Sequence, residues 1–459
     1  MASVVVDNPA TGETACTVEL IASSQLDEVL VRASSGGRDL AAMPLGQRLE
    51  LCEKAVQEFE AKADTVAADI TRQMGKPLGE ARSEIATMAA RARYMMSIAE
   101  DVLGELRLGD GRGVERFVER VPVGVVLDVP AWNYPLLTAV NAVFPAVIAG
   151  NAVILKHSSR TPLCGGQFQK AFEEAGAPPH SVIGIATDHA NTAALIADER
   201  VGYVAFTGSV GGGREVSAAA GGRFIDVGLE LGGKDAAYVR PDADLVLAAA
   251  GLAEGAFYNA GQSCCGVERV FAHRAVYGRL VDAITEQASS YRPGDPLEPG
   301  TSLGPMAQPE APGLLNAQVE DALGRGGRLT TGGRAVSVGG RGRYFEATVI
   351  ADATSEMTVM GDESFGPLVA MAPVDSDEEA VGAINDTRYG LTASIWTADR
   401  EAAINIGRRL EVGTVLVNRC DYLDPALPWS GWKDSGVGIT LSRFGFDRMT
   451  RTRGYHLRF

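Results

Sequence analysis

Apolar residues recur at helical spacing through the first quarter of the chain. The pattern over residues 24–100 predicts two or three amphipathic helices, with Ser24 capping the first of them. The last of these segments carries alternating charges on a helix rich in Ala and Met, and it includes Arg91 and Arg93. The two arginines could form an anion site, but charges spaced in this way are typical of a solvated helix face, and we expect that arrangement.

From residue 114 the periodicity changes to that of strands. Residues 114–122 alternate charged and apolar side chains, as an exposed hairpin or edge strand does, whereas 123–129 form an apolar run typical of a buried parallel strand. Strand-like runs then alternate with helical stretches as far as residue 209, which predicts a doubly wound parallel α/β sheet. A second α/β pattern runs from about Lys234 to Val417, and we expect the glycine-rich piece 332–342 to form an exposed turn.

Composition and charge narrow the class of protein. The chain has 459 residues, which predicts about two to four domains. Its net charge of -16 argues against a general nucleic-acid binder, which needs a basic surface. We expect neither a secretory signal nor a membrane span, because no stretch reaches the roughly 20 apolar residues that a span needs. The six cysteines show no zinc-type spacing, so we expect no metal site and a reducing, cytoplasmic location.

A glycine-rich turn follows one of the predicted strands. Phe206 ends an apolar run, and the residues from Gly208 to Gly213 then open a helix. Backbone amides at a helix N-terminus can hold a pyrophosphate, and glycines let it approach closely. The spacing matches neither the common dinucleotide fingerprint nor a phosphate-binding loop, so a plain glycine turn is equally compatible with it.

Three other segments carry side chains suited to catalysis. Cys264 and Cys265 stand in the loop GQSCC after an apolar helix, where a thiol can be exposed enough to react; a buried, inert cysteine is the alternative. Glu230 in ELGGK has a mostly apolar setting, which suits a general base with a raised pKa, although a surface turn is possible. Asn133 in PAWNYP can stabilise an oxyanion or belong to an aromatic-anchored turn.

Taken in order, these segments resemble the aldehyde dehydrogenase family. The order is NPATGE, AWN, GN-x-x-x-x-K, FTGS, ELGGK, GQ-x-C, E-x-FGP and a C-terminal P-x-x-G-x-K-x-SG, running from Asn8 to about Gly438. The spacing from Glu230 to Cys264 is also that of the family. Each motif is weak alone, whereas the full set in register is specific, and the resemblance covers nearly the whole chain.

The resemblance implies a particular division of the chain. A dinucleotide-binding domain would comprise residues 1–109 and 122–233, and a catalytic α/β domain residues 234–417. A small β-rich oligomerisation element would combine 110–121 with 440–459, and 418–439 would line the substrate tunnel and form a closing loop. Members of the family form dimers or tetramers, so we expect a homodimer or homotetramer.

The resemblance also assigns roles to single residues. Cys264 would be the nucleophile, Asn133 and the Cys264 backbone N–H the oxyanion hole, and Glu230 the base that activates the deacylating water. The cofactor would contact Trp132, Lys156, Ser159, Gly208, Ser209, Gly213, Leu231, Glu363 and Phe365. The aldehyde would contact Tyr134, Asn141, Ser263, Cys265, Arg419, Tyr422, Leu423 and Trp429.

Several positions depart from the family pattern. Ser159 replaces the acidic residue that often binds the adenosine 2′-hydroxyl, so we expect NADP to be accepted as well as NAD; the alternative is that Ser159 only fills space. His157, next to Lys156, could relay protons, but we expect a turn histidine with satisfied hydrogen bonds. Ile439 and Thr440 replace a family Arg-Glu pair, a change that we expect to affect packing and not chemistry.

The sequence therefore predicts a cytoplasmic enzyme that oxidises an aldehyde to its carboxylic acid with NAD or NADP. The aldehyde itself is not readable, and a succinate-semialdehyde dehydrogenase is the second hypothesis because the short chain and the Lys-His-Ser-Ser sequence resemble that branch. Two hypotheses of other classes are a thiol esterase, which needs only the nucleophile and oxyanion hole, and a silent structural homologue, which has no need for all three catalytic residues.

Overall fold

The computed structural model of the chain describes residues 2–109 and 113–459. A hairpin of β1 (Ser3–Asp7) and β2 (Thr14–Glu19) precedes the helices α1 (Leu26–Ala42), α2 (Leu45–Ala61), α3 (Ala63–Met74) and α4 (Leu78–Leu103). The prediction of two or three helices was wrong: α1 is capped by Met43, which is extended before Pro44, and Gly75 ends α3 at φ 86°. Ser24 does not cap α1 but lies in a short 3₁₀ turn, Ser23–Gln25.

The first sheet is parallel and doubly wound, as predicted. Its order is β9 (Asp226–Glu230), β8 (Val201–Thr207), β5 (Val125–Val129), β6 (Ala152–Lys156) and β7 (Val182–Ile185), and β21 (Gly436–Val437) pairs antiparallel with β9. The chain runs from β5 outward to β7 and then returns to β8, on the other side of β5. This reversal opens a crevice at the carboxyl ends of β5 and β8.

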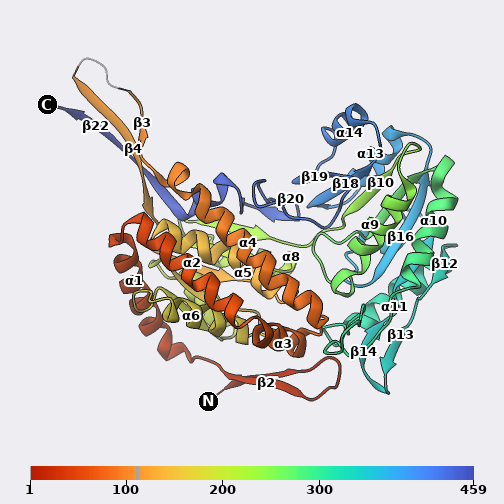
Figure 1. The fold of residues 1–459 in the computed structure, drawn as a ribbon, viewed down its shortest axis with the longest axis horizontal. Helices are drawn as coiled ribbons and strands as arrows, with labels where there is room; N and C mark the ends of the chain where they lie inside the picture. The colour runs from red at the N-terminus through yellow and green to blue at the C-terminus, as the bar shows by residue number, and fades with distance from the viewer. Residues whose placement is uncertain (1, 110–112) are drawn as a thin grey trace.

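Helices cover both faces of this sheet and form two cores, which together make the first lobe. One face buries α2 to α6, including α5 (Pro135–Ala149) and α6 (Leu163–Glu174). The other face buries α1, α7 (His189–Ala197) and α8 (Val210–Ala220). Figure 1 shows this lobe, coloured from red to yellow-green, beside a second lobe coloured green to blue.

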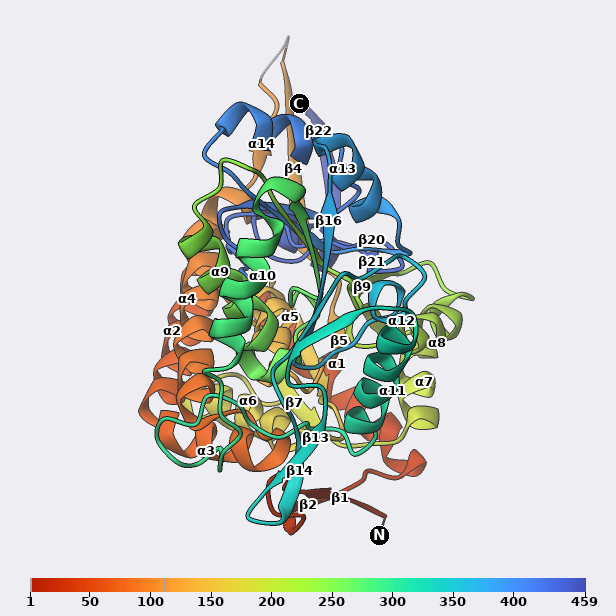
Figure 2. The same ribbon diagram turned by 90° about the vertical axis from the view of Figure 1, so that its right-hand side faces the viewer.

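The second lobe is built on a seven-stranded sheet. Its order is β12 (Arg328–Thr331), β15 (Thr348–Ala351), β16 (Leu368–Val374), β11 (Arg269–His273), β10 (Ala236–Val239), β18 (Thr392–Trp396) and β19 (Thr414–Val417), with only β12 antiparallel to its neighbour among these described strands. Figure 2 shows β16 crossing the middle of this lobe, between α9 (Leu245–Phe257) with α10 (Arg274–Ala288) on one side and α11 (Ala311–Gly324) with α12 (Thr358–Gly361) on the other.

Smaller elements complete the second lobe. They are the helices α13 (Asp377–Asn385) and α14 (Arg400–Gly407), the pair β17 (Tyr389–Gly390) and β20 (Trp432–Lys433), and a hairpin of β13 (Ala335–Val338) and β14 (Arg341–Phe345). The hairpin corrects the prediction of a simple turn at 332–342. Because Gly339 and Gly340 both take positive φ, they supply the tight reversal while the residues on either side pair.

A three-stranded arm projects from the first lobe (Figure 1). It contains β3 (Leu106–Arg107), β4 (Val114–Pro122) and β22 (Thr450–Arg458), in the order β22-β4-β3. Strands β4 and β22 pair along their whole length, from Thr450 opposite Pro122 to Arg458 opposite Val114. Both predicted strands of this element are present, and residues 110–112 of the predicted segment lie outside the described residues.

Candidate active site

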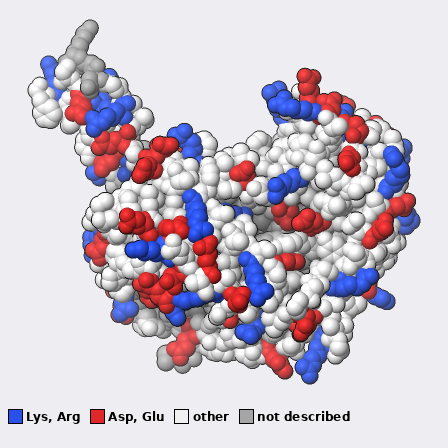
Figure 3. Space-filling model, viewed as in Figure 1, with Lys and Arg blue, Asp and Glu red and all other residues white. Residues whose placement is uncertain are grey.

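Two large cavities meet between the lobes, on the side where Figure 3 shows the surface to be hollowed. One, of about 610 Å³, lies at the carboxyl ends of the first sheet, and the other, of about 660 Å³, is lined by α4, α5, α9 and the segment 418–429. Four residues line both cavities: Asn133, Thr207, Glu230 and Cys264. The three residues predicted to be catalytic thus lie together at the junction, and Thr207 joins them.

A strained loop presents Cys264 at this junction. After α9 a 3₁₀ turn, Tyr258–Gly261, contains three consecutive residues with positive φ: Asn259, Ala260 and Gly261. A Cβ at Gly261 would lie 2.1 Å from the carbonyl oxygen of Gly366, so only glycine fits there. Since such conformations persist only where the surroundings impose them, the loop holds the cysteine in one place.

Asn133 and Asn259 fasten this loop to α5. Asn133 is buried, and its Nδ2 donates to the carbonyl of Gln262 at 3.1 Å. Asn259 Nδ2 in turn donates to the carbonyls of Asn133 at 3.0 Å and Gln262 at 3.1 Å. The amide of Asn133 therefore lies beside the segment that leads directly into Cys264, as an oxyanion donor requires.

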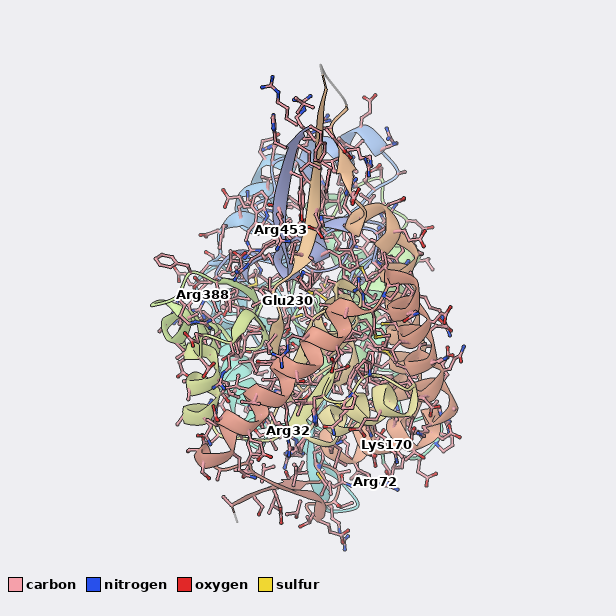
Figure 4. The ribbon with its side chains drawn as sticks, turned by 90° about the vertical axis from the view of Figure 1, so that its left-hand side faces the viewer. Arg32, Arg72, Lys170, Glu230, Arg388 and Arg453 are labelled. Atoms are coloured by element: carbon pink, nitrogen blue, oxygen red, sulfur yellow. The ribbon has the colours of Figure 1, made fainter. Side chains whose placement is uncertain are left out.

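Glu230 ends β9 and is held by two hydroxyls. Thr440 Oγ1 donates to one carboxylate oxygen, and Thr207 Oγ1 donates to the other at 3.3 Å. Burial raises the pKa of Glu230, and the bonds from Thr440 and Thr207 act against that rise. Figure 4 labels Glu230 near the middle of the view, away from the outline of the molecule. Thr440, which replaces the family acid, therefore lies in direct contact with the candidate base, and the expectation that this change leaves the chemistry unaffected stays a prediction.

The neighbouring cysteine has a different environment. Cys265 is buried, and its thiol donates to Asp421 Oδ1 at 3.0 Å, an atom that also accepts a bond from Ser263 Oγ at 2.9 Å. A hydrogen bond with Cys264 and burial raise the pKa of Cys265 well above its usual range. A thiol held protonated is a poor nucleophile, so Cys264 is the better candidate. Asp421 carried no motif signal and was missed in the sequence.

The first cavity fits the phosphates of a dinucleotide. It is lined by Gly208 and Ser209 at the start of α8, where Ser209 Oγ accepts the backbone N–H of Gly212 at 3.1 Å. A Cβ at Gly212 would lie 2.7 Å from the ring of Phe206, so glycine is favoured at this position. Because glycine has no side chain, a phosphate can approach the backbone at the N-terminus of the helix. Gly213, which was predicted to contact the cofactor, instead faces the side chain of Leu231 and does not line the cavity. Gly212 lines the cavity in its place.

An acid and two aromatic rings line the end of the first cavity that lies nearest to Cys264. Towards Cys264, Glu363 accepts the N–H of Gly233 at 3.0 Å, and burial raises its pKa to about 7. The rings of Trp132 and Phe365 lie edge to face there, 5.5 Å apart. The other predicted cofactor residues, Lys156, Ser159 and Leu231, also line the cavity.

The ribose end holds a charge that the sequence did not reveal. Asp188, the N-cap of α7, lines the cavity and interacts with Lys156, whose pKa is lowered by burial. Arg160 turns away and pairs with Asp7, so it offers no second cation to a 2′-phosphate. His157 is buried between Thr161 and the carbonyl of Pro135, and burial lowers its pKa to about 4, as expected of a structural histidine.

The second cavity contains every predicted substrate residue. Its walls include Tyr134, Asn141, Ser263, Cys265, Arg419, Tyr422, Leu423 and Trp429. Arg419 is exposed and lies over the ring of Tyr422, 3.3 Å from its centroid. Arg91 also lines the cavity and is only 6% exposed, so the expectation of a solvated face was wrong for it. Arg93 is exposed as expected and pairs with Glu53 and Glu60.

Comparison with known proteins gives the family. The model of the aldehyde dehydrogenase family matches residues 2–454. The chain belongs to this family. It is 34% identical over 97% of its length to an aldehyde dehydrogenase of Paenarthrobacter nicotinovorans, 97% of which is covered. It is also 33% identical over 95% of its length to a succinate semialdehyde dehydrogenase of Escherichia coli strain K12, named for NAD(P)+, 94% of which is covered.

Solved structures agree with this assignment. The structure of Gox0499 superposes with a TM-score of 0.96 at 31% identity, covering 100% of both chains. An aldehyde dehydrogenase of Brucella melitensis biovar abortus 2308 gives a TM-score of 0.95 at 29% identity, covering 100% of this chain and 94% of that one. The protein is thus an aldehyde dehydrogenase, an oxidoreductase that uses NAD or NADP, and the predicted fold class is confirmed. Among its described helices, none is long and apolar enough to cross a membrane.

Proposed function

We propose that this aldehyde dehydrogenase oxidises an aldehyde to the free carboxylic acid through a thioester on Cys264. The observation that supports the proposal is the junction of the two cavities. Cys264, Asn133 and Glu230 line both the first cavity and the second cavity there. A nucleophile, an amide donor and a base with a raised pKa can there act on one carbonyl carbon.

The thiolate of Cys264 attacks the aldehyde carbon, and the carbonyl oxygen becomes an alkoxide beside the Asn133 amide and the Cys264 backbone N–H. When bound, NAD(P)+ supplies a nicotinamide ring that accepts hydride. Loss of hydride from that carbon leaves a thioester on Cys264. Glu230 then takes a proton from water, the resulting hydroxide attacks the thioester carbon, and the C–S bond breaks to give the acid and the thiolate.

The dinucleotide would lie in the cavity that starts at α8. Gly208, Ser209 and Gly212 would hold the pyrophosphate, Lys156 and Ser159 the adenosine ribose, and Glu363 with Phe365 the nicotinamide half. With a serine in place of an acid at 159, NADP should be accepted. Asp188 returns some negative charge to this end, so NAD should be used as well.

The test is NAD(P)H formation at 340 nm across aliphatic, aromatic and carboxylated aldehydes, with NAD and with NADP. We expect turnover by the parent and none by Cys264→Ser. If the enzyme hydrolyses a nitrophenyl ester without nucleotide and oxidises no aldehyde, it is a thiol esterase. If it does neither, it is a silent homologue.

A succinate-semialdehyde dehydrogenase is the more specific candidate. Relatives that bear this name share 33% identity with the chain over 95% of its length, and the chain has a buried cation in its second cavity. The same panel decides between this candidate and a general aldehyde dehydrogenase, because the former should favour the four-carbon semialdehyde over pentanal.

We further propose a homodimer or homotetramer assembled through the β3-β4-β22 arm. The arm leaves Leu106 and Leu108 more than half exposed, which suits a partner chain. Six free cysteines and the absence of disulfides suit a reducing compartment, and we propose the cytoplasm.

A further inference from the structure

Two arginines of α4 differ sharply in their surroundings. Arg93 faces solvent and is neutralised by Glu53 at 2.8 Å and Glu60 at 2.7 Å. Arg91, two residues earlier, is 6% exposed and lines the second cavity together with Cys264 and Glu230. Among the described residues it has no carboxylate within ion-pair distance. A buried guanidinium with no directly paired carboxylate is costly, and an anion that bound it would lower that cost.

The guanidinium of Arg91 also has unused donors. Its Nη1 group donates to the carbonyl of Leu137 and to Asn141 Oδ1, both at the long distance of 3.3 Å. The Nε group is buried and has no acceptor among the described residues, and no bond from Nη2 is found there either. Because the Nε group is closed to solvent, Nη2 is the donor with which the guanidinium can bind an anion in the cavity.

The other charged groups of this cavity are already engaged or face outward. Glu84 pairs with Lys76 and accepts the N–H of Leu136. Asp421 accepts bonds from Ser263 and Cys265. Glu230 is held by Thr207 and Thr440, Glu254 is exposed, and the exposed Arg419 lies over Tyr422. Arg91 is therefore the one buried cation on the described wall of the cavity, and although the charge of Glu230 acts on it, no carboxylate among the described residues forms a direct ion pair with it.

We propose that Arg91 is the anchor for a carboxylate on the aldehyde substrate. The substrate would be a short aldehyde with a carboxylate at the end remote from its carbonyl, so that one end reaches Cys264 while the other binds Arg91. This inference rests on the proposed function, since it concerns the same cavity. It adds the residue that separates an acidic aldehyde from a neutral one of equal size.

The test compares kcat/KM for succinate semialdehyde and for pentanal, which has a similar length and no charge, in the parent and in Arg91→Gln, Arg91→Lys and Arg93→Gln. We expect the parent to favour the charged aldehyde and Arg91→Gln to lower the ratio of the two values by about tenfold or more, the usual loss when a charged hydrogen bond is removed. Arg91→Lys should keep part of the ratio, because it keeps the charge but not the planar guanidinium that also reaches Leu137 and Asn141. Arg93→Gln should keep all of it.

Inhibition by succinate gives a second readout, since succinate carries the carboxylate but cannot be oxidised. Its Ki should rise about tenfold or more in Arg91→Gln and stay constant in Arg93→Gln. The proposal is overturned if the parent shows no preference for the charged aldehyde, or if Arg91→Gln slows both aldehydes equally with an unchanged Ki; the residue would then support Glu230 through Asn141. If no aldehyde is oxidised by the parent, the proposed function fails instead.

Discussion

The first prediction concerns Cys264 and Cys265, which are adjacent in the sequence but differ in their hydrogen bonds. Cys264→Ala should abolish aldehyde oxidation, because the thiol forms the covalent intermediate, while nucleotide binding stays near the parent value. Cys265→Ala should cost less than about tenfold, since it loses the contacts of a buried thiol with Asp421, Ser263 and Cys264 but no bond-forming group. Steady-state NAD(P)H formation and fluorescence titration with NADH measure the two effects. An equal loss in both variants would show that the nucleophile has been misassigned.

Replacing the candidate base should separate the two halves of the reaction. Glu230→Gln cannot take a proton from water, so we expect one rapid equivalent of NAD(P)H per active site followed by slow turnover. In the parent, the raised pKa of Glu230 predicts that steady-state turnover falls as the pH drops through that pKa, because the base must be ionised, while the burst persists. Stopped-flow absorbance measures both phases. Linear turnover of Glu230→Gln at the parent rate would remove this residue from the mechanism.

The third residue-scale prediction concerns the choice of cofactor. Ser159 lines the cavity beside Lys156, so a 2′-phosphate meets a hydroxyl and a cation. We expect NADP to be used with a kcat/KM no worse than about tenfold below that of NAD, and Ser159→Glu to shift preference toward NAD by about 1–2 kcal/mol. Ser159→Ala is the control, because it removes the hydroxyl without adding charge. A parent that discriminates about a hundredfold against NADP would contradict the argument.

At the scale of single elements, strand β5 carries an unexplained acid. Asp128 is 2% exposed, its Oδ2 has no partner among the described residues, and burial raises its pKa well above the usual range. A carboxyl whose pKa is higher in the folded chain stabilises the fold at low pH, and this contribution is lost as the pH rises through the folded pKa. Asp128→Asn should therefore raise Tm more at pH 8 than at pH 5.

Each unit of pKa difference corresponds to about 1.4 kcal/mol, so the effect should be measurable by scanning fluorimetry at the two pH values. The exposed Asp101→Asn is the matched control and should show no such pH dependence. A Tm gain from Asp128→Asn that is equal at both pH values would mean that the carboxyl is ionised in the folded chain at pH 5 as it is in the unfolded one, so that burial has not raised its pKa above that pH.

Most helices and strands could be predicted from the periodicity of apolar residues. Contacts between residues that are distant in the sequence could not. The parallel strands of both sheets and the catalytic loop follow from apolar runs and ordered motifs. The burial of Arg91 does not, because α4 is covered on that side by α5, and only the fold reveals which helix face is enclosed. The contacts of Thr440 with Glu230 and of Asp421 with Cys265 were missed for a similar reason: each joins residues more than 150 positions apart, and no local pattern indicates which side chains meet.

At the scale of the whole molecule, the projecting arm predicts assembly. Leu106 is 61% and Leu108 51% exposed on its outer strand and the segment that follows. Leu106→Asp with Leu108→Asp should break the oligomer into single chains, whereas Leu314→Asp, at an equally exposed position on α11, should leave it intact. Light scattering after size-exclusion chromatography measures the masses. A parent that elutes as a single chain would refute the proposed assembly.

The return of the C-terminus to the first lobe also sets the order in which the protein can be completed during synthesis. Phe446 and Met449 fill the same core as α4 and α5, and Asn151 donates to the carbonyl of Met449 at 3.0 Å. Strand β22 then pairs with β4, more than three hundred residues earlier. The first lobe therefore leaves the ribosome with a gap in its core, and it closes only after the second lobe has emerged. A chain that ended before its last strand would leave the edge of β4 unpaired and open to cellular proteases.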